Sequence, residues 1–160
     1  MSIRIRKIKS ADVNWIKTIF NQCWGGDFVV TLGKVHRPET LSGFIAEVDS
    51  KKKGLITFKI ADKEMEIISL DSFLKKRGIG TMLVSRVIGL AKNQKIKRIW
   101  LITTNDNLKA LKFWQNRGFC LVKVYPNALE ISRKLKPGIP LIGEDGIPLR
   151  DEIELEMRLQ

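Results

Sequence analysis

The sequence predicts one globular domain of the mixed α/β (α+β) class. The chain has 160 residues, of which 44% are hydrophobic, and a chain of this length folds around a single core. Its first half carries several short runs at strand spacing, whereas its second half alternates strand-like with helix-like segments. A strand–helix–strand order places at least two strands parallel, so we expect a mixed sheet.

The first elements follow from the spacing of apolar residues. Isoleucines alternate loosely with basic residues over 2–9 and predict an opening strand. Ser10 is expected to cap the helix that follows, in which apolar residues recur at i, i+3, i+4 and i+7 from Ile16 to Cys23. Gly25 ends this helix, and the spacing places Cys23 in the core.

Residues 27–70 change from an irregular to a β-type pattern. Residues 27–42 have no clean period, so we expect a short extended piece and a loop that leaves the lone histidine, His36, exposed. Three short β-type runs between 44 and 70 predict an antiparallel meander, with Lys51-Lys52-Lys53 at a hairpin tip.

The second half ends in a distinct tail. Before it we expect a helix after Gly80, a buried strand over 98–104, a helix over 107–116 and a strand over 119–125. Prolines and glycines make 136–150 a loop. Residues 152–159 alternate strictly and predict a final strand with one apolar and one solvated face. Such a strand pairs within the chain or with a second copy, so a homodimer stays open.

The charge of the chain points to an anionic partner. There are 29 Lys and Arg against 17 Asp and Glu, for a net charge of +12. Residues 137–160 hold two of the basic and six of the acidic side chains, so residues 1–136 carry a net +16. This excess suits a nucleic acid or a phosphorylated cofactor, although a basic surface also serves solubility alone.

Several classes of protein are excluded by what the sequence lacks. It has no apolar run long enough to span a membrane and no apolar signal core, so we expect a cytoplasmic protein without a membrane partner. Its two cysteines, Cys23 and Cys120, are too few for a disulfide framework and lack metal-ligand spacing. We therefore expect reduced thiols and no metal.

The segment from Leu70 to Thr81 has the composition of an anion site. It reads LDSFLKKRGIGT, a basic turn between a strand and a helix. Gly78 and Gly80 allow the backbone to approach a ligand, and the start of the helix adds a positive dipole end. Three cationic side chains precede the glycines: Lys75, Lys76 and Arg77. Neither the dinucleotide fingerprint nor the P-loop fits this spacing.

Two motifs make the sequence resemble the GNAT superfamily of N-acetyltransferases. The acetyl-CoA loop of that family reads Gln/Arg-x-x-Gly-x-Gly/Ala, and residues 75–80 read KKRGIG, with lysine at the first position. The second family motif, Asn-x-x-Ala-x-x-hydrophobic-Tyr-x-x-x-Gly-Phe, is matched from Asn107 to Phe119, with Trp114 in the tyrosine position. The resemblance covers residues 2–125 and a closing strand.

The resemblance implies a fold and a co-substrate. The fold is a twisted, mostly antiparallel sheet of about seven strands, opened into a V by a bulge in the strand before the loop. It implies one N-acetyltransferase domain over 1–160, with 126–160 as a variable tail, and acetyl-CoA in the V without a metal. The residues implied to bind acetyl-CoA are Leu70, Lys75, Lys76, Arg77, Gly78, Ile79, Gly80, Thr81, Asn107 and Trp114. For Asn107, a helix N-cap is an equally natural role.

The implied reaction is the attack of a primary amine on a thioester. An alkylammonium ion has a pKa of about 10.4, so a base or a water chain must take its proton. Glu64 and Glu66 share a face of the strand before the loop and are the candidate bases, with Glu66 nearer the expected bulge; a solvated strand face is the alternative for both. Trp114 cannot serve as the usual tyrosine acid. Tyr125, Cys120, a water molecule or unassisted departure of the thiolate remain.

The acceptor is expected to be a small-molecule or peptide amine. Its pocket would lie between 24–41, where His36 is a further candidate to orient the amine, and the tail, whose acids Glu144, Asp145 and Asp151 would attract a cation. Two other functions stay open. One is a CoA-binding sensor without turnover; the other is a nucleic-acid or ribosome-associated module. The latter explains the charge, but the sequence has no helix-turn-helix or aromatic RNA-binding signature.

Overall fold

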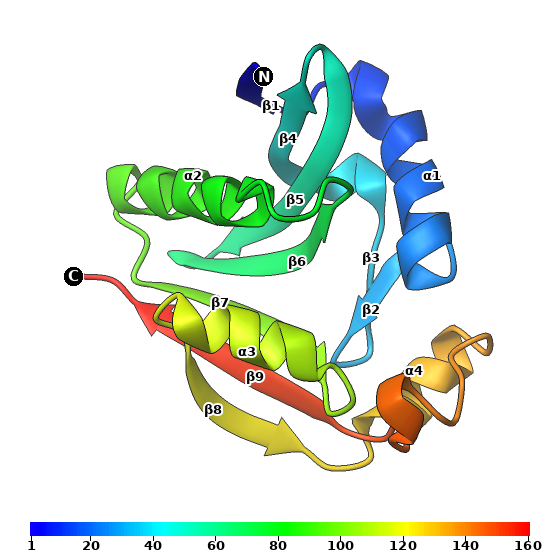
Figure 1. Cartoon of the computed structure of the whole chain (residues 1–160). Coiled ribbons are helices and arrows are strands. Elements are labelled where there is room, and N and C mark those ends of the chain that lie inside the picture. Colours follow the sequence, from blue (N-terminus) through cyan, green and yellow to red (C-terminus); the bar gives the residue numbers. More distant parts are fainter.

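A computed structural model describes all 160 residues as nine strands and four α-helices (Figure 1). The strands are β1 (Ile3–Lys7), β2 (Val29–Thr31), β3 (Lys34–His36), β4 (Ser42–Val48), β5 (Lys51–Ala61), β6 (Glu64–Ser72), β7 (Arg98–Thr104), β8 (Cys120–Tyr125) and β9 (Glu152–Arg158). The helices are α1 (Val13–Trp24), α2 (Ile79–Asn93), α3 (Leu108–Asn116) and α4 (Ala128–Leu135). No helix is long and apolar enough to cross a membrane.

Seven of the strands form one mixed sheet, and the mixed α/β class is confirmed. The strand order is β1-β4-β5-β6-β7-β9-β8, and β2 and β3 form a separate hairpin. Only β6 and β7 run parallel, because α2 connects them; every other neighbouring pair is antiparallel. The expected meander of β4, β5 and β6 is present.

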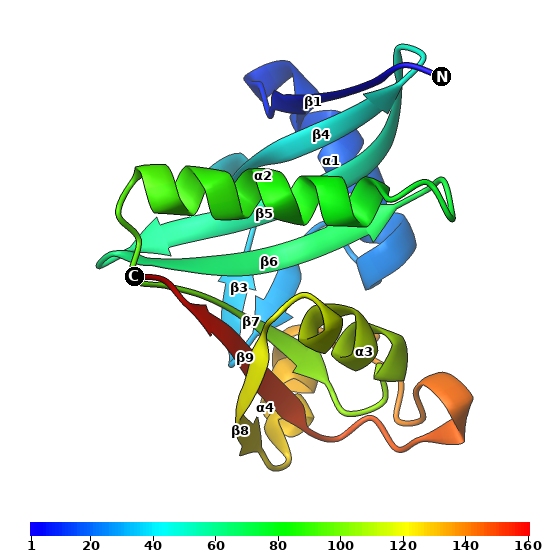
Figure 2. The ribbon, with the colours of Figure 1, turned by 60° about the vertical axis from the view of Figure 1, so that its left-hand side comes forward.

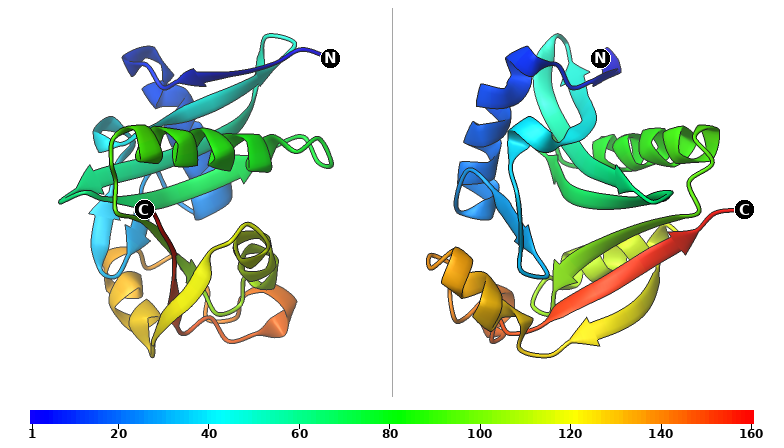
Figure 3. Two further views of the ribbon diagram at one scale, coloured as in Figure 1. Left: turned by 90° about the vertical axis from the view of Figure 1, so that its left-hand side faces the viewer. Right: turned by 180° about the vertical axis from the view of Figure 1, so that it is seen from behind.

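Helices cover both faces of the sheet. Helices α2 and α3 lie on one face, whereas α1, α4 and the β2–β3 hairpin lie on the other (Figures 2 and 3). Buried residues on the α2 side include Phe44, Leu83 and Phe119. A smaller core under α1 is built on Ile16 and Phe20. The apolar stripe predicted for α1 is therefore the face that covers the sheet.

The start of α1 differs from the prediction that Ser10 caps it. A short 3₁₀ turn spans Ser10–Asp12, and the α-helix begins after it. The carboxylate of Asp12 accepts the backbone N–H of Lys9 at 2.8 Å, and it also binds the Arg6 guanidinium through two contacts of 2.9 Å. The acid, with two lone-pair-rich oxygens, satisfies more donors here than a serine hydroxyl can. Gly25 ends the helix at φ +72°, as predicted.

The lysine run is not a hairpin tip. The turn consists of Asp49 and Ser50, both at positive φ (48° and 67°), and Lys51-Lys52-Lys53 already belongs to β5. Lys52 pairs with Glu47 across the ladder, and its ammonium lies 3.1 Å from Asp12. A run of lysines alone does not distinguish a solvated turn from a strand in which the lysines form ion pairs with acidic side chains.

The tail contributes more to the structure than a loop and an edge strand. Helix α4, which no apolar period predicted, lies at the start of the 126–160 tail, and β9 lies between β7 and β8 rather than at an edge. Glu152 and Glu154 were expected in solvent but are only 1% and 7% exposed. Both carboxylates can be buried because they are hydrogen-bonded. Glu152 accepts from Ser132, and Glu154 accepts from Arg98 and Tyr125.

The sheet opens between its parallel strands. β6 and β7 pair only from Glu64 and Arg98 to Ile67 and Leu101, after which both strands continue without pairing. On its other side β6 has one extra residue, Ile68, between the positions that face Phe58 and Thr57 of β5. This bulge turns the end of β6 away from β7, and the expected V is visible between the two strands (Figures 1 and 2).

Candidate active site

The opening between β6 and β7 forms a cleft of about 740 Å³. Its walls come from the unpaired ends of both strands, from α3 and from the start of α2, and one end is bounded by the last residues of α1. The lining residues from β6 are Ile67–Ser72, those from β7 are Leu101–Thr103, and those from the helices include Trp24, Gly80, Asn107, Phe113 and Trp114. The bulge in β6 is thus what creates the cleft.

The loop at the mouth of the cleft leaves backbone donors free. Gly78, at φ +70°, turns the chain into α2, and a Cβ there would meet no atom within 4 Å. The first bonded N–H of the helix is that of Met82, which donates to the Gly78 carbonyl at 2.9 Å. The N–H groups of the first turn have no acceptor within a helix, so they are free to bind an anion.

The cationic side chains gather at this end of the cleft. Lys75 and Lys109 line it, and Lys76 and Arg77 are exposed beside it. Arg117 was not predicted. Its guanidinium donates to the Thr81 hydroxyl at 3.1 and 2.5 Å and stacks 3.5 Å above the ring of Phe113. No local pattern indicates this contact, because it joins residues 36 positions apart.

The residues implied to bind acetyl-CoA are not equivalent in the structure. Leu70, Lys75, Gly80, Asn107 and Trp114 line the cleft. In contrast, Ile79 is a buried core residue, and the Thr81 hydroxyl is bound by Arg117. Only the backbone of Ile79 is therefore available to a ligand, whereas the exposed Thr81 hydroxyl still has its own hydrogen to donate.

Asn107 and Trp114 hold the α3 wall in place. The Asn107 Oδ1 accepts the N–H of Ala110 at 3.1 Å, so this residue caps α3 while its side chain lines the cleft. Trp114 is 5% exposed and packs edge-on between Phe113 and Phe119, with ring centroids 5.0 Å from each. Its indole is a wall of the cleft and has no proton to give at neutral pH.

A second hollow, of about 660 Å³, lies on the face of the sheet that carries the β2–β3 hairpin, and Lys34, Val35 and His36 of β3 line it. Glu66 and Trp100 also line it, and the next residues along each strand, Ile67 and Leu101, line the cleft. The two hollows therefore adjoin at the point where β6 and β7 separate.

Glu66 occupies a half-buried, hydrogen-bonded position in the second hollow. Burial raises the pKa of its carboxyl, and the Thr31 hydroxyl opposes this by donating to Glu66 Oε2 at 2.9 Å. Thr31 in turn lies 2.6 Å from His36 Nε2. The expected loop position of His36 is wrong: the residue belongs to β3 and is 2% exposed, and burial lowers its pKa to about 4.

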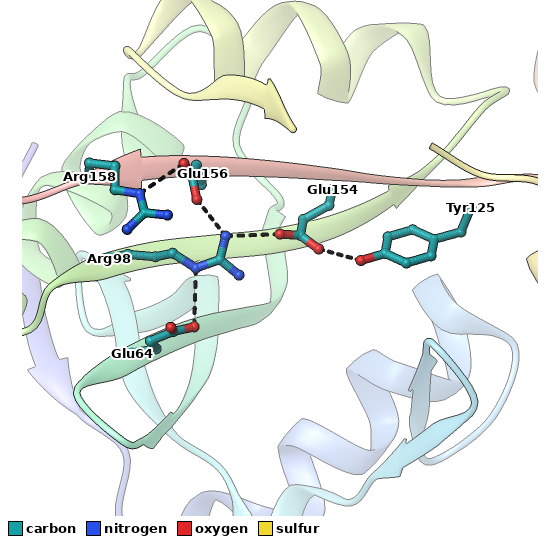
Figure 4. A network of polar contacts seen from close by, with 6 residues as sticks. All are labelled: Glu64, Arg98, Tyr125, Glu154, Glu156 and Arg158. Carbon is teal, nitrogen blue, oxygen red and sulfur yellow. Dashed lines mark hydrogen bonds and ion pairs between the residues drawn. The ribbon is translucent and has the colours of Figure 1, made fainter. Parts of the chain in front are cut away.

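The other two predicted proton-transfer residues, Glu64 and Tyr125, belong to a structural network (Figure 4). Arg98 donates to Glu64 at 3.1 Å and to Glu154 at 2.9 Å. The Tyr125 hydroxyl donates to Glu154 at 2.6 Å, which raises the pKa of the tyrosine to about 12. Tyr125 lines neither hollow. We therefore assign it no proton transfer, and Glu64 is less available as a base than Glu66.

An acid that no sequence pattern indicated lies inside the cleft. Burial raises the pKa of Asp71 to about 6, and its carboxylate accepts the indole N–H of Trp24 at 3.1 Å. Cys23 was expected in the core but is exposed and lines the cleft, because it faces away from the buried stripe of α1. The thiol is partly desolvated at the wall of the cleft, and this together with the neighbouring Asp71 raises its pKa to about 11.

The tail supplies one acid to the cleft. Glu144 lines it, and its backbone N–H is held by Asp106 at 2.9 Å. Asp145 is exposed. Asp151 is bound by the guanidinium of Arg150 at 2.8 Å and by the N–H of Asn127 at 2.9 Å, so it secures the tail instead of facing the cleft. Of the three tail acids considered, only Glu144 lies where a ligand would meet it.

A mixed sheet divided between its parallel strands, with a basic glycine loop at the mouth of the division, is the architecture of acetyltransferases of the GNAT class. The model of the acetyltransferase (GNAT) family matches residues 13–119, and this chain belongs to that family.

Similar proteins cover almost the whole chain. YxbD of Bacillus subtilis (strain 168), an uncharacterized protein, is 40% identical over 146 residues, which are 91% of this chain and 92% of that protein. YdhI of the same organism, also uncharacterized, is 45% identical over 135 residues, 84% of each.

Solved structures share the fold. A Bacillus subtilis acetyltransferase in complex with CoA has a TM-score of 0.72 at 20% identity, over 99% of this chain and all of that one. A GNAT family acetyltransferase from Elizabethkingia anophelis with acetyl-CoA bound has a TM-score of 0.72 at 22% identity, over 98% of both chains.

Proposed function

We propose that this protein transfers the acetyl group of acetyl-CoA to a primary amine in a ternary complex. The observation that carries the proposal is the pair of hollows that adjoin where β6 and β7 diverge. One hollow ends at a basic glycine loop and the other contains the half-buried carboxylate of Glu66. A donor in the cleft and an acceptor in the second hollow would meet where β6 and β7 separate.

The cleft fits acetyl-CoA by its chemistry. Free N–H groups in the first turn of α2 would bind the pyrophosphate, assisted by Lys75, Arg77 and Arg117. Beyond Ile67 the edge of β6 that faces β7 is unpaired and offers its backbone groups, including those of Leu70, to the pantetheine amides; Asn107 lines the same cleft. The two structural relatives described above contain CoA or acetyl-CoA, which supports the same ligand here.

Glu66 is the proposed base. The incoming ammonium gives a proton to the Glu66 carboxylate, and the freed nitrogen lone pair attacks the thioester carbonyl carbon. The C–S bond then breaks, and its electron pair leaves with CoA as a thiolate. The second proton of the attacking nitrogen passes to this thiolate or to water, which leaves the neutral amide and CoA. A thiol of pKa about 8.5 leaves without an acid. No protein acid is needed, which is consistent with the indole of Trp114 lining the cleft and with Tyr125 and Cys120 outside it.

The acceptor is proposed to be a small-molecule or peptide amine that carries positive charge. An acceptor whose amine reaches the thioester would extend toward the α1 end of the cleft, where Asp71 lies beside Trp24 without a cationic partner. Glu144 also lines the cleft without a cationic partner. Asp71, half-buried, would be stabilised as a carboxylate by a bound ammonium or guanidinium group. Ribosomal-protein-S18-alanine N-acetyltransferase from Escherichia coli shares the fold at 12% identity (TM-score 0.72, over 99% of this chain and 95% of that one). It illustrates that a protein amine is one class of acceptor for this fold.

The test is acetyl-CoA binding by calorimetry, followed by release of free CoA thiol across a panel of amines and basic peptides. Glu66→Gln removes the base at constant size and should lower turnover by about 10²- to 10⁴-fold. Glu130→Gln, at an exposed position on α4, is the matched control and should leave turnover unchanged. Binding without thiol release from any amine would favour a CoA sensor. Binding of nucleic acid but not of acetyl-CoA would favour the basic binding module.

A further inference from the structure

Three side chains from three strands form a hydrogen-bonded chain that ends at the proposed base. His36 Nε2 on β3 lies 2.6 Å from Thr31 Oγ1 on β2, and Thr31 Oγ1 donates to Glu66 Oε2 on β6 at 2.9 Å. We infer that His36 is a positioning residue for acetyl transfer, which fixes the Thr31 hydroxyl as a donor and thereby holds Glu66 ionised and oriented toward the acceptor. The inference rests on the proposed role of Glu66.

The hydrogen count along the chain fixes its direction. A threonine hydroxyl has one hydrogen, and an ionised carboxylate only accepts. When Thr31 donates to Glu66, its oxygen must accept from His36, so His36 carries its hydrogen on Nε2. A neutral imidazole is required for this, and burial lowers the pKa of His36 to about 4. The ring is therefore neutral throughout the range in which Glu66 is ionised.

His36 Nδ1 has no hydrogen-bond partner, which indicates that the role of the ring depends on its Nε2. Nδ1 is fully buried and has no hydrogen-bond partner, whereas buried polar atoms in folded proteins nearly always have one. Thr31 is itself only 6% exposed. A purely apolar residue at position 36 would avoid the unpaired atom, so the donor that faces Thr31 is the feature of this side chain that the structure uses.

The hairpin that carries both residues is anchored on the far side of the second hollow. The backbone N–H of Leu32, in the turn between β2 and β3, donates to Glu152 of β9 at 3.1 Å. This contact ties the hairpin across the opening between β6 and β7 (Figure 3). Thr31 and His36 are therefore presented to Glu66 by a short strand pair fixed at its tip.

The charges around Glu66 leave the Thr31 hydrogen bond as a main stabilising contact. Burial and the carboxylate of Glu152 raise the pKa of Glu66, while the Thr31 hydroxyl and the ammonium groups of Lys34 and Lys59 lower it. Asp62 and Glu64 line the same hollow, with Glu64 bound to Arg98. Loss of the Thr31 donor removes the only hydrogen bond that the protein makes to this carboxylate, so the pKa of Glu66 must rise.

The decisive measurement is the pKa of the Glu66 side chain, followed by ¹³C NMR on the full chain without added ligand. The Glu66 signal is assigned as the one absent from Glu66→Gln. Thr31→Val keeps the shape of the side chain, and His36→Phe keeps a ring; both should raise the Glu66 pKa by about one unit. Thr31→Ser and His36→Gln retain the two donors and should leave it near the parent value.

A structural role alone would not produce this pattern. An unchanged Glu66 pKa in His36→Phe would overturn the inference, whatever Thr31→Val shows. The His36 tautomer, read from ¹⁵N shifts in the parent protein, needs no variant: hydrogen on Nε2 supports the inference, and hydrogen on Nδ1 contradicts it. Full turnover in Glu66→Gln would instead contradict the proposed function, whatever the NMR titration shows.

Discussion

Gly80 is the position at which one added side chain should separate ligand binding from folding. It lies in the first turn of α2 and lines the cleft. A Cβ built there would lie 3.4 Å from the ring of Phe113 and 4.0 Å from Leu70, so it points into the gap between α3 and β6. The three further carbons of Gly80→Leu have no room except in the cleft.

The expected loss of acetyl-CoA affinity follows from the contacts that the new side chain would block. The pyrophosphate would lose at least two charge-assisted hydrogen bonds to the first turn of α2, each contributing about 1.5–3 kcal/mol. Together these are about 3–6 kcal/mol, a decrease in affinity of roughly 10²- to 10⁴-fold. Folding should not suffer, because leucine has a higher helix propensity than glycine.

Calorimetric titration with acetyl-CoA, together with the midpoint of thermal unfolding, measures both effects. Gly89→Leu is the matched control, since Gly89 lies in the same helix and a Cβ there meets no atom within 4 Å. We expect both variants to unfold near the parent temperature and only Gly80→Leu to lose binding. Equal affinity of the two variants would refute the placement of the ligand at this loop.

Two further predictions concern stability. Asp12→Ala should destabilise the protein by about 3 kcal/mol in urea unfolding at pH 7, because it leaves the Arg6 guanidinium without its main partner. The Arg6 contact holds the pKa of Asp12 well below its usual range, so this stabilisation is fully present above pH about 4 and is lost progressively as the pH falls further. A difference between parent and variant that is as large at pH 2 as at pH 7 would contradict the assignment. Gly54→Ala would place a Cβ 2.6 Å from Ile79 and should lower the free energy of unfolding by about 1–3 kcal/mol. Gly138→Ala, where a Cβ meets no atom within 4 Å, should leave it unchanged. Equal losses of stability in the two variants would show that α2 does not pack tightly against β5 at Gly54.

The fold could be predicted wherever an element has its own period or breaker. The isoleucines of β1, the stripe of α1 that ends at Gly25, and the alternation of β9 are local signals, and the structure contains each element. The position of β9 inside the sheet was not predictable, since alternation gives the faces of a strand but not its neighbours. For the same reason the burial of Glu152 was missed.

The residues of the candidate site likewise fall into those that local sequence predicts and those that it does not. The anion loop is one continuous stretch of sequence, and so is the cap formed by Asn107 at the start of α3. The residue types and spacing within each stretch therefore predict its role. Arg117, Asp71 and the contact between Thr31 and Glu66 join segments that only the fold brings together, and no spacing predicts them. His36 was misjudged because a lone histidine in an irregular segment gives no sign of the hairpin that buries it.

The central claim is that the cleft between β6 and β7 holds acetyl-CoA with its acetyl group presented to Glu66. The most direct test is thiol release from acetyl-CoA by the full chain at saturating donor, with the best amine of the panel and across pH, for the parent and Glu66→Gln. We predict that the rate rises with pH through a group whose pKa lies above that of an ordinary glutamate, and that this dependence disappears with most of the rate in the variant. An identical rate and pH profile in both proteins would contradict the account.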